Sequence, residues 1–74
     1  MDMRMSVKIT IPGIIDSREL YEDIKDTGAH VTDMGACTLV RVTADIRSDV
    51  IERVIAACNK YHPDCHVACC MLKD

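Results

Sequence analysis

The chain has 74 residues, a formal net charge of −3, and two Tyr as its whole aromatic content. This composition disfavours nucleic-acid binding, which uses clustered Lys and Arg together with aromatic stacking. No apolar run reaches the ~20 residues of a membrane span, and residues 1–11 lack the continuous apolar stretch of a signal peptide. We therefore expect a cytoplasmic protein with one domain, residues 1–74.

The chain begins with a pattern typical of a half-buried strand. Apolar and polar residues alternate over residues 3–11, and a period of two places alternate side chains on opposite faces of a sheet. Pro12 and Gly13 follow, and this pair is typical of a turn. The strand should therefore end at this point.

A first helix is predicted over residues 17–27. Asp16 and Glu19 have the spacing of a capping box, and Gly28 suits the position just after a helix. Its buried stripe is expected to consist of Leu20, Tyr21 and Ile24.

Two short strands joined by a turn come next. Residues 30–33 are predicted as the first strand, and residues 34–36 have the composition of a turn. Residues 38–44 alternate again. The inward side chains of this strand should be Val40, Val42 and Ala44.

A second helix and a last strand complete the pattern. The helix is expected to begin near Ser48 and to end within residues 59–63. Residues at helical spacing predict its buried face: Val50, Val54, Ala57, Cys58 and Tyr61. Residues 65–72 are apolar at nearly every position, so we expect both faces of this strand to be covered.

The order strand-helix-strand-strand-helix-strand predicts an α+β, ferredoxin-like βαββαβ fold. This fold is a four-stranded antiparallel sheet with two helices on one face. Right-handed crossovers place the first and third strands in the middle and the second and fourth at the edges. The open face should then carry Ser6, Lys8, Thr10, Leu39, Arg41 and Thr43.

The apolar last strand predicts self-association, because exposed apolar edges are usually paired or covered. A homo-oligomer, a homodimer in its simplest form, is therefore expected. Its interface should use residues of the last strand and of the open face: Val67, Cys69, Met71, Leu39 and Arg41.

Five cysteines are many for a chain of this length, and free thiols are the expected state in a reducing compartment. Cys58 and His62 lie one helical turn apart, and Cys65 follows in the next loop. These three residues are the candidate zinc ligands. The alternative is that Cys58 and one of Cys69 or Cys70 are small apolar core residues, and no cofactor is expected in that case.

The chain resembles an ACT-type regulatory domain. The matching features are the alternating first strand, Pro12 and Gly13 before the first helix, and Gly28 and Ala29 before the second strand. The resemblance implies that an amino-acid effector binds at a dimer interface. The ligand contacts would come from the first loop, at Gly13, Ile14 and Ile15.

With no catalytic motif, the leading hypothesis is a non-enzymatic regulatory or protein-interaction domain. It would be homo-oligomeric and bind a small-molecule effector or another protein. One alternative is a thiol-based metal or redox module that uses the C-terminal Cys and His residues. Another is a small inhibitor or adaptor that acts through a sheet edge or an acidic helix surface, Glu19, Glu22, Asp23 and Asp26.

Overall fold

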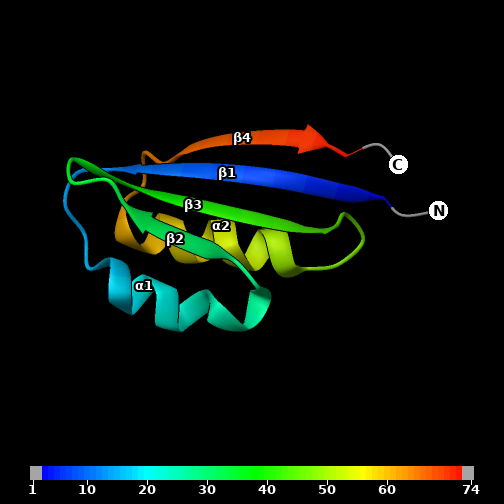
Figure 1. Cartoon of the computed structure of the whole chain (residues 1–74), viewed down its shortest axis with the longest axis horizontal. Helices are drawn as coiled ribbons and strands as arrows, with labels where there is room; N and C mark the ends of the chain where they lie inside the picture. The colour runs from blue at the N-terminus through cyan, green and yellow to red at the C-terminus, as the bar shows by residue number, and fades with distance from the viewer. Residues whose placement is uncertain (1–2, 73–74) are drawn as a thin grey trace.

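Two layers make up the structure, a four-stranded antiparallel sheet and two helices that cover one of its faces (Figure 1). The computed structural model describes residues 3–72, so residues 1, 2, 73 and 74 of the predicted domain lie outside the described part. The elements are β1 (Arg4–Pro12), α1 (Ser17–Ile24), η1 (Lys25–Thr27), β2 (His30–Asp33), β3 (Cys37–Asp45), α2 (Val50–Tyr61) and β4 (His66–Met71). The strand order β2-β3-β1-β4 confirms the predicted ferredoxin-like α+β fold and its two edge strands.

The hydrophobic core lies between the sheet and the helices. β1 pairs with β3 along its whole length, and the alternation of strand side chains turns every second residue toward the helices. In β1 the fully buried residues are Val7, Ile9 and Ile11. In β3 the predicted inward residues Val40 and Val42 are buried, and Ala44 is half-buried.

The first helix begins as its sequence predicts. Asp16 is the N-cap, and its Oδ1 accepts a hydrogen bond from the Glu19 backbone N–H at 3.1 Å. The α-helix stops at Ile24 and continues as the 3₁₀ turn η1. Thr27 explains the change, because its hydroxyl donates to the Ile24 carbonyl at 2.6 Å and competes with the helical backbone bonds. Gly28 then takes a left-handed conformation at φ 81°.

The predicted buried stripe of α1 is wrong at Tyr21, whose exposed fraction is 43%. Leu20 and Ile24 are four residues apart and share the inward face. Tyr21 lies one residue further, about 100° around the helix, and so turns toward solvent.

The second helix has its inward face at Ile51, Val54 and Cys58. The sequence pattern predicted the last two but missed Ile51. The predicted residues Val50, Ala57 and Tyr61 are half-buried at the margin of this face.

Two polar contacts join the helices to each other. The Arg53 guanidinium donates to Asp26 at 3.0 Å, and the Tyr61 hydroxyl donates to Asp23 at 3.2 Å. One side of α2 therefore lies beside α1. Because α1 packs against β2, these contacts link α2 to the β2 side of the sheet.

The last strand differs most from its prediction, since neither of its faces is covered. Every residue of β4 is exposed. The prediction that Cys69 or Cys70 is a core residue is therefore wrong. α2 packs against β1 and β3, and in Figure 1 β4 lies beyond β1 at the edge of the sheet that the helices leave free. The helix layer is too narrow to reach this edge, which explains how an apolar strand remains open to solvent.

Candidate functional site

β4 is the one described strand without a buried or half-buried residue. Val67 and Met71, with Leu72 just after the strand, are three of the eight large apolar side chains that are exposed in residues 3–72. The six residues of β4 include no Asp, Glu, Lys, Arg or Pro. Natural edge strands are usually shielded by charge, proline or short length. β4 has none of these protections, so its edge is free to accept another strand.

The strand register assigns the exposed side chains of β4 to two faces. Cys69 lies opposite the buried Val7, and Val67 lies opposite the buried Ile9. Directly opposed residues share a face of the sheet, so Val67, Cys69 and the equivalent Met71 are on the helix side. The face toward open solvent carries His66, Ala68 and Cys70.

The free backbone groups of β4 follow from one hydrogen bond. The Leu72 N–H donates to the Arg4 carbonyl of β1 at 3.0 Å. In an antiparallel ladder alternate residues bond to the same neighbour, so the even-numbered residues of β4 bond to β1. The odd-numbered residues then point their N–H and C=O groups away from the sheet. They are Val67, Cys69 and Met71, the same three that present apolar side chains on the helix side.

The opposite edge is better protected. β2 has four residues and carries His30 and Asp33 at its ends. α1 packs against this strand, and residues 17–27 of α1 and η1 hold four carboxylates against two cationic side chains. A second negatively charged chain would be repelled here, so β2 is the less favourable of the two edges for self-association.

Basic side chains form a row across the open face of the sheet. Arg41 is paired with Lys8 of β1 on one side and with His30 of β2 on the other. Within residues 3–72 neither Arg41 nor Lys8 forms an ion pair with a carboxylate. Leu39 is the other residue of the predicted interface that lies on the open face of the sheet, and it is half-buried.

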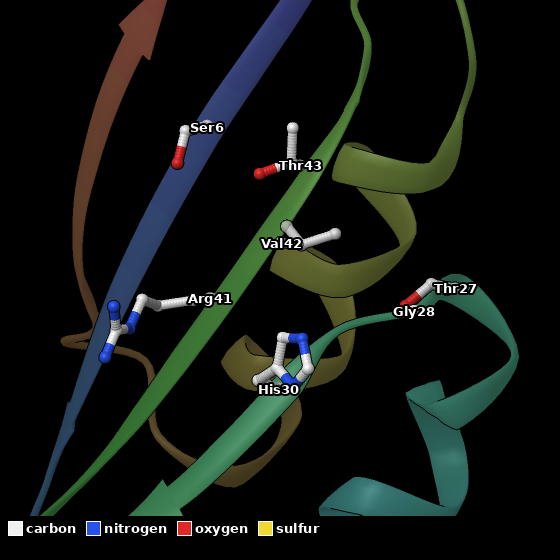
Figure 2. A pocket seen from close by; sticks show the side chains of 7 residues that line it. All are labelled: Ser6, Thr27, Gly28, His30, Arg41, Val42 and Thr43. Carbon is white, nitrogen blue, oxygen red and sulfur yellow. The ribbon is translucent and has the colours of Figure 1, made fainter.

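A polar hollow of about 340 Å³ lies beside this row, where β3 continues past the end of the shorter β2. Figure 2 shows its hydroxyl groups on β1 and β3, the His30 ring over β2, and the Arg41 side chain extending across β1. The lining residues are Ser6, Thr27, Gly28, His30, Arg41, Val42 and Thr43. The sequence prediction did not identify this hollow, because it depends on the pairing register of a short strand with a longer one.

The first loop, where the resemblance places an effector, is a well-defined turn. Gly13 has φ 84°, and its N–H donates to the Ala36 carbonyl at 3.0 Å. Ile15 packs against the core, whereas Ile14 is 91% exposed. Gly13, Ile14 and Ile15 are not part of the polar hollow, and the Gly13 N–H is already used within the protein.

The three candidate zinc ligands differ in their burial and in their hydrogen bonds. Cys58 is fully buried, and burial raises the pKa of its thiol to about 12. The Cys65 thiol donates to the His62 carbonyl at 3.0 Å, and burial raises its pKa as well. The His62 Nδ1 accepts the Asp64 N–H at 3.1 Å. In the described part of the chain no group of three or more His, Cys, Asp or Glu residues is arranged to hold a metal ion.

Comparisons of the chain with protein-family models, curated proteins and solved structures found no match. The resemblance to ACT-type domains therefore stays a prediction. No helix in the described residues has both the length and the apolar character to cross a bilayer.

Proposed function

We propose that this chain is a non-enzymatic interaction domain that associates with itself through the exposed edge of β4 and acts in a regulatory role. The observation that supports this proposal is the state of β4, an uncharged edge strand whose residues are all exposed. Such an edge offers unpaired backbone groups and apolar surface at the same place. Both are satisfied when a second strand pairs with β4.

Charge supports the same edge. The chain has a net charge of −3, so two copies repel each other unless their acidic surfaces stay apart. α1 and its carboxylates pack beside β2, at the other side of the sheet. Pairing through β4 keeps these acidic helices at the far ends of the assembly.

The test is a charge placed on the edge. Val67→Lys puts a cationic group on the helix side of β4, and in a symmetric assembly it enters the interface twice. We expect association to weaken at least about tenfold, because each unpaired charge at a desolvated edge costs about 1 kcal/mol or more. Sedimentation velocity over a range of concentrations measures the effect.

Met34→Lys is the matched control, since Met34 is 59% exposed in the turn between β2 and β3. It adds the same charge away from β4 and should leave association unchanged. A wild-type chain that is monomeric up to high micromolar concentration would overturn the proposal, as would equal effects of the two substitutions.

A small anionic molecule is the effector that we propose for the regulatory role. It is the polar hollow, rather than the Gly13 loop, that favours this ligand class, because Arg41 and His30 line it and Arg41 has no carboxylate partner in residues 3–72. Thermal-shift measurements with phosphate and with dicarboxylates test it. Arg41→Gln should abolish any shift and Arg18→Gln, at an exposed position on α1, should not. Equal shifts in both variants would contradict this site.

A further inference from the structure

We infer that the partner of β4 is the β4 of a second copy, paired antiparallel about a two-fold axis at Cys69. This inference rests on the proposed self-association and adds its register. The backbone groups, the side chains and the charges of β4 indicate that its partner is a second β4.

The backbone groups select the register. Only Val67, Cys69 and Met71 present free N–H and C=O groups, as the Leu72 to Arg4 hydrogen bond requires. An antiparallel pair about Cys69 sets Val67 against Met71 of the second copy and Cys69 against Cys69. All three outward residues of each strand then bond to an outward residue of the other. A shift by two residues in either direction leaves one of them without a partner inside the strand.

The side chains are compatible with this register. On the helix side Val67 meets Met71 and the small Cys69 lies at the axis, so each large residue has an apolar neighbour. On the open side Ala68 lies opposite Cys70 of the second copy. No residue of β4 carries a formal Asp, Glu, Lys or Arg charge, so no like charges meet. The strand is self-complementary, and this property favours a second copy over an unrelated strand.

The register predicts which thiols can be joined. Hydrogen-bonded residues opposite each other in an antiparallel pair have Cα atoms about 5.5 Å apart, which is within the ~4.4–6.8 Å range of disulfides. The Cβ atoms of such a pair are about 5.5 Å apart, so the two Cys69 residues form a disulfide after the strands shift locally by about 1 Å. The two Cys70 residues are offset by two positions along the strand, so their Cα atoms are about 8 Å apart. Cys70 is exposed like Cys69, and it is the internal control.

Oxidative crosslinking of the full reduced chain tests the inference. Diamide oxidises two thiols to one disulfide and takes up the two electrons and two protons that they release, becoming the hydrazine. We expect a covalent dimer from the wild type and from Cys70→Ser, and its loss in Cys69→Ser. Digestion and mass spectrometry should find the Cys69–Cys69 link. In denaturing urea, where no register exists, the two serine variants should crosslink equally.

Sedimentation velocity on the same samples distinguishes a wrong register from a failure of the proposed self-association. A dimer in solution that crosslinks through Cys70, or equally well without Cys69, contradicts this register and leaves the proposed self-association standing. A monomer that gives no crosslink contradicts both. Association that survives Val67→Lys, again without the Cys69 link, shows that the interface lies elsewhere and overturns the inference.

Discussion

The Cys58 thiol should resist alkylation while the protein is folded. Cys58 is 0% exposed, and burial raises its pKa from 9.0 to about 12. The thiolate is the nucleophile, and a rise of three pKa units lowers the thiolate population about a thousandfold at any pH below the ordinary value. Burial also blocks the reagent, so we expect Cys58 to react at least ~1000-fold slower in the folded chain than in urea.

Iodoacetamide labelling at about pH 8, followed by digestion and mass spectrometry, measures this ratio for each cysteine. Cys69 is exposed, and its labelling rate should change little on unfolding, so it calibrates the reagent. A Cys58 that reacts in the folded chain within about tenfold of its rate in urea would refute the reasoning. That result would favour the alternative of a thiol-based metal or redox module.

The same pKa predicts how stability depends on pH. Because the pKa of Cys58 is higher in the folded than in the unfolded chain, unfolding favours ionisation. The stability contribution is complete below about pH 9 and is lost as the pH rises toward about 12. Urea midpoints of the wild type should therefore fall more steeply over this range than those of Cys58→Ala, and parallel curves would contradict the assignment.

Two further predictions concern the fold around the site. Asp16→Ala removes the acceptor of the Glu19 N–H and should cost about 1 kcal/mol in the free energy of unfolding; an unchanged urea midpoint would show that the cap contributes nothing. Asp45 accepts hydrogen bonds from the Arg47 side chain and backbone N–H, which lower its pKa to about 2. Its stabilising contribution is present above about pH 4 and is lost as the pH falls toward 2. The urea-midpoint difference between the wild type and Asp45→Asn should shrink over that interval, and a constant difference would contradict the ion pair.

Local patterns predicted most of the fold. The alternation in β1 gave its buried side chains, and the Asp16 cap set the start of α1. The crossover rule assigned β4 to an edge. These features depend on neighbours in sequence or on general chain geometry, so they can be read without knowing how the layers pack.

Lateral packing could not be predicted in the same way. Helical periodicity identifies an apolar stripe but not which strands it covers. The contacts of Arg53 with η1 and of Tyr61 with α1 link residues 27 and 38 positions apart. They accompany a helix layer that leaves β4 open. The polar hollow likewise depends on where β2 ends relative to β3. The predicted interface at Val67, Cys69 and Met71 stays a prediction, now with a defined face and a set of free backbone groups.

Residue-resolved amide hydrogen exchange, measured by NMR at low and at high protein concentration, tests most directly whether β4 pairs with a second copy. The N–H groups of Ala68 and Cys70 bond to β1 and should be protected at both concentrations. The N–H groups of Val67, Cys69 and Met71 face outward, so they should exchange rapidly when dilute and become protected as the concentration rises. If these three amides exchange at the same rate at every concentration, β4 does not pair with a second copy.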